Sequence, residues 1–208
     1  VTVLNSPGGP RLIDWLQTAA TNQDLHSVLI NGTGPTLAAS NSLRLIQRTS
    51  GPDWQFVLLD ASAAYRGQVE QYRRGIMYVA PDLFVVHDHV VTATPMNFQM
   101  QLHPPAATRI DPDWQDLRLN LADIGVQIVA PSRKILRAWN QIASPADDFF
   151  PGTITTRIGP TNQLRQVDMI TVFAIRPGGL ARDYFAFKLV ESNTAVGARI
   201  HRAGRPTL

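Results

Sequence analysis

Cysteine is absent from the 208 residues, so the chain can form neither a disulfide nor a thiolate metal site. Lysine is nearly absent, because Lys134 and Lys188 are the two lysines among 19 basic residues. Arginine therefore carries almost all of the positive charge, and the net charge is +3. Its planar guanidinium suits carboxylates, sulfates and phosphates, so the composition permits an anionic ligand. No basic run is dense enough for a nucleic-acid footprint, and we expect no nucleic-acid partner.

Long hydrophobic runs are also missing, because no apolar stretch approaches about 18 residues, and we expect no membrane span. The hydrophobic fraction of 44% and the charged fraction of 17% are typical of a globular chain with a sizeable core. The length favours one domain over residues 1–208, with residues 200–208 as a flexible tail. Because the chain begins at Val1 and no signal-peptide pattern follows, we expect a mature or excised segment of a longer protein.

Short apolar or alternating runs, separated by turn-forming residues, fill most of the sequence. Their spacing is close to the roughly 8–12 residues that is typical of sandwiches and barrels. The pattern predicts an all-β protein, a large antiparallel β-sandwich. The predicted strands are 26–31, 43–49, 54–60, 74–80, 83–91, 97–103, 117–122, 125–130, 153–159, 168–175, 184–191 and 195–201.

The connections between these runs differ in clarity. The runs 74–80 and 83–91 predict a hairpin whose turn is Ala-Pro-Asp at 80–82. Helix signals are weak, and residues 9–23 fit either a single helical turn or a short helix. Residues 145–152 predict a loop with an aromatic pair that fills a gap in the core.

The run 97–103 predicts an antiparallel strand with one buried and one wet face, since strand side chains alternate. Phe98 and Met100 share the buried face, whereas Gln101 and His103 lie on the wet face. Two prolines follow His103 and stop the ladder of backbone hydrogen bonds. A histidine in this place either lines a cleft or hydrogen-bonds the turn.

His87 and His89 flank Asp88 on a predicted strand, so both imidazoles point to one face, about 7 Å apart by strand rise. His-x-His at this spacing can begin a metal site, but no Glu or His follows within the next hairpin to complete it. We therefore interpret both histidines as polar residues of the solvent face. Asp88 points towards the core, where a carboxylate needs a partner, and Arg74 on the neighbouring strand is the predicted partner.

Four stretches follow one another in a characteristic order. LHSVLINGTGP at 25–35 carries a histidine on a strand before an Asn-Gly turn, and YRRGIMYVAPDLFVVHDHV at 72–90 is an arginine-bearing hairpin. FQMQLHP at 98–104 is a histidine-bearing strand, and VDMITVFAIRPGG at 167–179 ends in a Pro-Gly turn. Together they resemble the C-terminal β-sandwich of heparinase II/III-like polysaccharide lyases. The likeness covers most of residues 1–200.

The resemblance implies a fold and a chemistry. Such lyases pair an N-terminal α/α toroid with this sandwich and cleave uronic-acid-containing polysaccharides by β-elimination. A base removes the proton on C5, a tyrosine or histidine protonates the leaving oxygen, and the uronate carboxylate must be neutralised. The implied partners are an acidic polysaccharide and a toroid domain or chain. The implied location is the periplasm or the outside of the cell.

The resemblance also implies a possible zinc ion, which several relatives bind in the sandwich, and His26 falls on one ligand position. The other positions depart from the family. The upstream His-x-His-x-Asp stretch is missing, and VLNSPGG at 3–9 places Asn5 near the position of the aspartate. An amide is a poor zinc ligand, so a complete site is not expected in this chain. His26 stays open as a functional or a structural residue.

The leading hypothesis is the β-sandwich portion of a polysaccharide lyase, inactive by itself. His26 is its candidate catalytic and metal-binding residue, and His103, Arg66 and Arg73 are candidate contacts to an acidic sugar. A second hypothesis is a non-catalytic carbohydrate-binding or assembly module that uses tryptophans as stacking platforms. A third is a cupin-type metal enzyme built on the His-x-His pair. The tryptophans, most of which we assign to the core, are Trp15, Trp54, Trp114 and Trp139.

Overall fold

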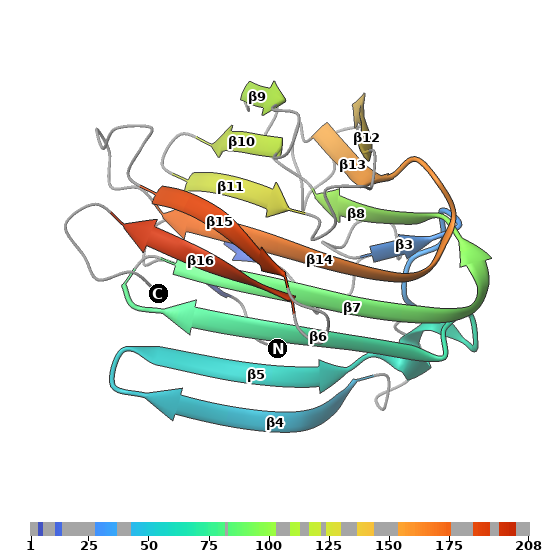
Figure 1. Cartoon of the computed structure of the whole chain (residues 1–208), viewed down its shortest axis with the longest axis horizontal. Helices are drawn as coiled ribbons and strands as arrows, with labels where there is room; N and C mark the ends of the chain where they lie inside the picture. The colour runs from blue at the N-terminus through green and yellow to red at the C-terminus, as the bar shows by residue number, and fades with distance from the viewer. Residues whose placement is uncertain are drawn as a thin grey trace.

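The computed structural model describes residues 4–5, 11–13, 28–36, 43–81, 83–102, 109–112, 117–121, 124–129, 137–143, 154–175, 185–191 and 196–202. Antiparallel strands make up most of this part of the chain (Figure 1). The described residues include one short 3-10 helix, η1 (Ser62–Tyr65), and none of them forms a helix with the length and apolarity that a bilayer crossing requires. The prediction of an all-β antiparallel sandwich is confirmed.

Two sheets form the sandwich, and two short hairpins accompany them. From edge to edge, the large sheet contains β4 (Arg44–Gly51), β5 (Trp54–Asp60), β6 (Gln71–Val79), β7 (Leu83–Met96), β14 (Leu164–Ile175), β11 (Ile124–Val129), β10 (Leu117–Leu121) and β9 (Arg109–Pro112). The small sheet contains β12 (Arg137–Ala143), β13 (Ile154–Pro160), β8 (Phe98–Leu102) and β3 (Val28–Ile30). The hairpins are β1 (Leu4–Asn5) with β2 (Arg11–Ile13), and β15 (Phe185–Glu191) with β16 (Val196–Arg202).

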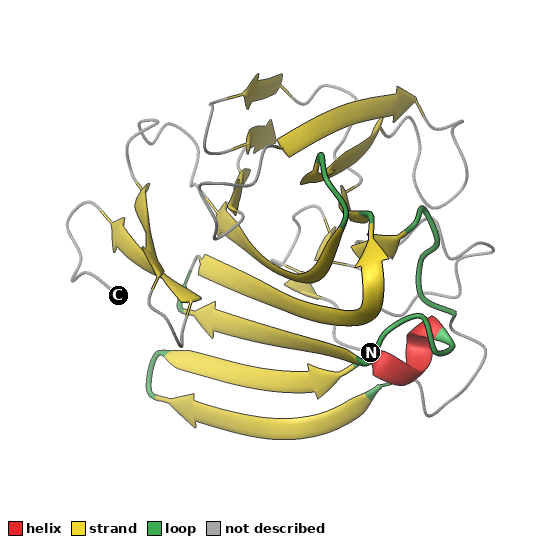
Figure 2. Ribbon diagram, turned by 45° about the vertical axis from the view of Figure 1, so that its right-hand side comes forward, coloured by secondary structure: helices red, strands yellow, loops and turns green. Residues whose placement is uncertain are grey.

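The main core lies between the two sheets. Side chains of β7 alternate, so Phe84, Val86 and Val90 point inward and pack in one cluster with Val28 and Phe98 of the small sheet. Burial of each such apolar side chain contributes roughly 1.5–3 kcal/mol. Figure 2 shows η1, in red, at the end of the long strands of the large sheet.

The outer face of the large sheet is its face away from the small sheet, and β16 covers one end of it. Ile200 of β16 packs with Leu83 of β7 and with Ile170 and Val172 of β14, in a second apolar cluster. In Figure 1 the β15–β16 hairpin accordingly lies across β14. The outer face is therefore partly a core and partly a surface.

Several predicted segments can be compared with the structure. The hairpin 74–80 with 83–91 is confirmed as β6 and β7, joined through a cis Ala80–Pro81 peptide. In 9–23, where the weak helix signal fell, Arg11–Ile13 form β2, and the rest of that segment lies outside the described residues. The predicted tail 200–208 begins too early, because β16 continues to Arg202 and Ile200 is buried. The predicted loop 145–152 lies outside the described residues.

The predicted wet face of β8 is wrong at Gln101, whose exposed fraction is 0%. Its side-chain oxygen accepts a hydrogen bond of 2.9 Å from Nε of Arg157, the residue paired with it on β13. Phe98 and Met100 are buried as predicted. Alternation therefore separated the two faces of β8 correctly. Alternation could not show that Gln101, on the other face of β8, is shielded from solvent. A buried amide needs a hydrogen-bond partner, and Arg157 supplies it.

Candidate functional site

The outer face of the large sheet changes from apolar to charged along its strands. Residues paired across neighbouring antiparallel strands share a face, so they form rows across β5, β6, β7 and β14. Starting beside β16, the rows are Trp54–Val79–Leu83–Ala174, Phe56–Met77–Val85–Val172, Leu58–Gly75–His87–Ile170 and Asp60–Arg73–His89–Asp168. We call the last of these the charged row. It brings the predicted contact residue Arg73 next to one histidine of the His-x-His pair.

His87 and His89 both hydrogen-bond to the same carboxylate oxygen of Asp168. Nε2 of His87 lies 2.9 Å from Oδ1, and Nδ1 of His89 lies 2.8 Å from it. The side chains of His87, His89 and Asp168 are 39%, 26% and 17% exposed. The histidines thus lie on a partly exposed face, as predicted, but the sequence misses their common partner. Asp168 comes from β14, 81 residues after His87.

The environment of Asp168 favours its charged form. Burial by itself raises the pKa of this carboxyl. His87 and His89, which hydrogen-bond to it, together lower the pKa by more than burial raises it, so the pKa lies below its usual range. The second oxygen is less engaged, since Nε2 of Gln166 lies 3.4 Å from Oδ2. Asp168 is therefore an ionised anchor that fixes the orientation of both imidazole rings.

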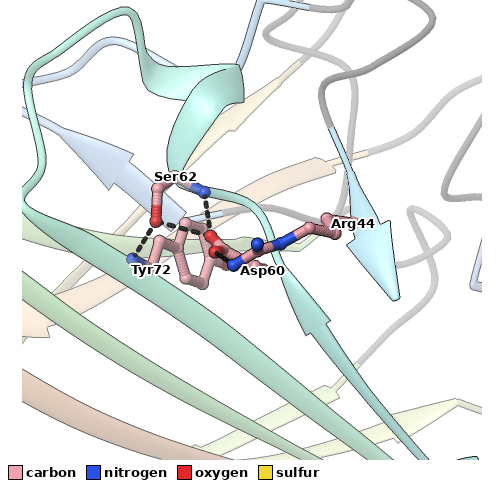
Figure 3. A network of polar contacts seen from close by, with 4 residues as sticks. All are labelled: Arg44, Asp60, Ser62 and Tyr72. Atoms are coloured by element: carbon pink, nitrogen blue, oxygen red, sulfur yellow. Dashed lines mark hydrogen bonds and ion pairs between the residues drawn. The ribbon is translucent and has the colours of Figure 1, made fainter. Parts of the chain in front are cut away.

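Arg73 lies between Asp60 and His89 in the charged row and is exposed. Asp60 is engaged elsewhere, as Figure 3 shows: Oδ1 accepts hydrogen bonds from the backbone nitrogen and the hydroxyl of Ser62 at 3.0 and 2.6 Å, and Oδ2 accepts one from Arg44 at 2.9 Å. The Ser62 hydroxyl contributes most to holding the pKa of Asp60 below its usual value. Among the described residues, Arg73 has no ion-pair partner.

The structure locates two of the four predicted site residues. Arg66 is exposed in the turn after η1, in a left-handed conformation with φ of 47°, and no described contact joins it to Arg73. His26 and His103 lie outside the described residues. Their roles therefore stay predictions. Asn5, which stands where the resemblance expects an aspartate, lies in β1.

Zinc binding finds no support in the donor set. Among the described residues, no group of three His, Asp, Glu or Cys side chains is arranged to hold a metal ion. The two imidazoles instead contact the Asp168 oxygen directly, at hydrogen-bonding distance. Asn5 offers an amide where zinc prefers a carboxylate or imidazole. Within the described residues the His-x-His pair therefore has no third metal ligand, and we derive no chemistry from zinc.

The predicted pair of Arg74 and Asp88 is confirmed and lies in the core. Nε of Arg74 donates to Oδ1 of Asp88, and a second nitrogen donates to Oδ2 at 3.0 Å. The Tyr72 hydroxyl donates to Oδ1 at 2.7 Å, while the Tyr65 hydroxyl donates to the Val28 carbonyl oxygen at 2.6 Å. Burial lowers the pKa of Arg74 and the charge of Asp88 raises it, with a net increase. The Tyr65 and Tyr72 rings contact each other with their centres 5.1 Å apart, so the ion pair, both tyrosines and Val28 of the small sheet form one buried group.

Asp168 is the residue of this site that sequence reasoning missed. One signal was present: the run 168–175 places this carboxylate on the same face as Ile170 and Val172, and a carboxylate among apolar neighbours needs a partner. The same argument found Arg74 for Asp88, because those strands are adjacent in the chain. It could not choose the partner of Asp168, because the pairing of β14 with β7 is not visible in the sequence.

No protein-family model and no curated protein matches this sequence. Solved structures match it in fold. A mutant of heparan sulfate lyase HepC from Pedobacter heparinus matches 89% of this chain with a TM-score of 0.66 and 8% identity. The fold is that of a heparinase β-sandwich. Two heparinase III structures match 88% of the chain with TM-scores of 0.65 and 0.62, at 11% and 14% identity.

This chain spans about a third of the length of these heparinases, since it covers 30% of the HepC mutant and 29% of each heparinase III. The matched part is their C-terminal part. The resemblance that the sequence motifs indicated is therefore confirmed at the level of the β-sandwich. At these identities the match shows the fold.

Proposed function

We propose that this chain is the β-sandwich portion of a polysaccharide lyase that cleaves uronic-acid-containing polysaccharide by β-elimination. The observation that carries the proposal is the fold match to a heparan sulfate lyase and to heparinase III over 88–89% of the chain. An α/α toroid, in another domain or chain, supplies the rest of the cleft. The proposed location is the periplasm or the outside of the cell, where such polysaccharides occur.

The reaction defines what the protein must provide. A base takes the proton from C5 of the uronate, the C4–O bond breaks, a C4–C5 double bond forms, and an acid protonates the leaving oxygen. A cation next to the carboxylate stabilises the charge that develops beside it. His26 is the proposed base or acid contributed by the sandwich, and arginines of this chain supply positive charge.

The decisive measurement is the ultraviolet absorbance of the unsaturated uronate product. The protein in its natural full length is incubated with heparan sulfate, heparin, hyaluronan and alginate. In His26→Ala, turnover of the preferred substrate should fall by at least about 100-fold, the usual contribution of a general acid or base. His201→Ala, a change of the same kind at an exposed position of β16, serves as the matched control and should keep its activity.

Two outcomes would contradict the proposal. Absence of product from every uronate polymer, with binding retained, would favour the non-catalytic carbohydrate-binding or assembly module. Full activity in His26→Ala would return His26 to the structural residues. Near-native unfolding midpoints of both variants are needed to separate loss of chemistry from loss of fold.

A further inference from the structure

We propose that Arg73 and His89, backed by Asp168 and His87, form a subsite on the outer face of the large sheet that binds a sulfate or carboxylate group of a sugar chain. That the ligand belongs to a sugar chain rests on the proposed function. That it is anionic rests on the charged row itself. The proposed subsite does not include His26 and needs no metal.

Arg73 is exposed, and its row neighbour Asp60 is occupied by Ser62 and Arg44. Within the part of the chain that the structure describes, no ion pair therefore uses the Arg73 guanidinium. A guanidinium offers two parallel N–H donors, which match the oxygens of a carboxylate or a sulfate. Arg73 is thus available to a ligand without the loss of an internal partner.

His89 is paired with Arg73 on one side and with Asp168 on the other. Its Nδ1 is held by Asp168, so Nε2, at the far end of the ring, is left for a ligand, and the side chain is 26% exposed. A protonated imidazole donates from both nitrogens, one to Asp168 and one outward. His89 can therefore add a second, directed hydrogen bond to the anion that Arg73 attracts.

The Asp168 carboxylate by itself repels anions. Asp168 is less exposed than the two rings, at 17% against 39% and 26%, and its Oδ1 lies within 2.9 Å of both. A ligand that approaches the face meets the rings before it meets Oδ1. The role of Asp168 is then to orient His87 and His89, which makes it a positioning residue.

The neighbouring row suits a sugar ring. Gly75 has no side chain, and the Phe56 ring lies over it, 3.1 Å from the position that a Cβ would take. His87 borders the same position, since its Cβ lies 4.0 Å from it. A half-buried aromatic ring beside the charged row gives the apolar face of a sugar a surface to contact. This combination favours a charged saccharide over a free inorganic anion.

The test measures affinity of the full-length protein for a heparan sulfate oligosaccharide in low salt, where charge contacts are weakly screened. Arg73→Ala should weaken binding at least about tenfold, because charge-assisted hydrogen bonds are lost. The affinity of Arg73→Lys should lie between those of wild type and Arg73→Ala, since lysine keeps the charge and loses the paired donors. The matched control is Arg48→Ala, an exposed arginine that the register places on the opposite face of the same sheet, and it should bind within about twofold of wild type.

Hyaluronan, which carries carboxylates alone, and dextran sulfate, which carries sulfates alone, identify the recognised group. Arg73-dependent binding of either one supports the subsite. Equal losses in Arg73→Ala and Arg48→Ala, or no binding of any of the three polymers by the wild type, would overturn it. Arg73-dependent binding without an unsaturated product would support the subsite and contradict the proposed lyase function. Product formation, with binding that Arg73→Ala weakens no more than Arg48→Ala does, would support the lyase function and contradict the subsite.

Discussion

Arg74 and Asp88 face each other across β6 and β7 with side chains that are 3% and 0% exposed. Two hydrogen bonds from the guanidinium and one from the Tyr72 hydroxyl satisfy the carboxylate. The pair lies in the core between the sheets, with Arg74 5.7 Å from the centre of the Tyr72 ring. Charges in such a place are stable only together, because each by itself has lost its hydration.

Removal of the charge of Arg74 or Asp88 alone should therefore lower the free energy of unfolding far more than removal of both charges together. Asp88→Asn should lower the free energy of unfolding by about 3–5 kcal/mol, because it leaves a buried arginine without its counter-charge. The double variant Arg74→Met with Asp88→Leu should recover most of that loss. Urea unfolding midpoints check both values. Arg44→Ala, which breaks the exposed pair with Asp60, is the control and should cost less than about 1 kcal/mol. Similar losses in Asp88→Asn and Arg44→Ala would contradict this account.

Thr171 of β14 is 1% exposed, and its hydroxyl oxygen has no hydrogen-bond partner among the described residues. Thr171→Val, which keeps the shape and removes the unsatisfied polar group, should raise the free energy of unfolding by roughly 1 kcal/mol. Thr92 is the matched control, since it is 2% exposed and its hydroxyl donates to the Thr94 carbonyl at 2.8 Å. Thr92→Val should destabilise by a comparable amount. Thermal unfolding that shifts both variants in the same direction would refute the distinction.

Gly159 of β13 lies against the backbone of β8. A Cβ at this position would be 1.9 Å from the carbonyl oxygen of Phe98, so the two strands would have to separate. Gly159→Ala should therefore cost at least about 3 kcal/mol or abolish soluble expression, as overpacking of a core does at its worst. Gly197→Ala, on β16, meets no atom within 4 Å and should be neutral. Solubility and unfolding midpoints that are equal for the two variants would show that β8 and β13 can shift without cost.

Because the pKa of Asp168 is lowered in the folded protein, part of the free energy of unfolding depends on pH. A carboxyl whose pKa is lower in the folded state stabilises the protein at any pH above its unfolded-state pKa, which is near 4. This contribution is lost as the pH falls through the folded-state pKa. The difference in unfolding free energy between wild type and Asp168→Asn should thus shrink between about pH 5 and pH 2. Urea titrations across that range measure it. A difference that stays constant would mean that Asp168 gains nothing from its two histidines.

Alternation and turn residues predicted the long strands and the β6–β7 hairpin, but four strands escaped prediction: the short β1 and β2, and β9 and β12. Both β12 and β9 lie at sheet edges. In β12, one face would carry Arg137 and Trp139 and the other Asn140 and Ile142, so neither reads as apolar. β9 ends in Pro112, which edge strands tolerate and central strands do not. Edge strands need less burial than central ones, and the periodic signal weakens accordingly.

The sequence by itself determined that the chain is an all-β sandwich, that Asp88 belongs with Arg74, and that His87 and His89 share a face, because side-chain period and adjacent strands are local properties. The tertiary structure alone decided that Asp168 holds both histidines, that Arg73 completes their row, and that Gln101 is buried. These relationships depend on which strands become neighbours after long excursions of the chain. That choice follows from the packing of both sheets together, and no single segment encodes it.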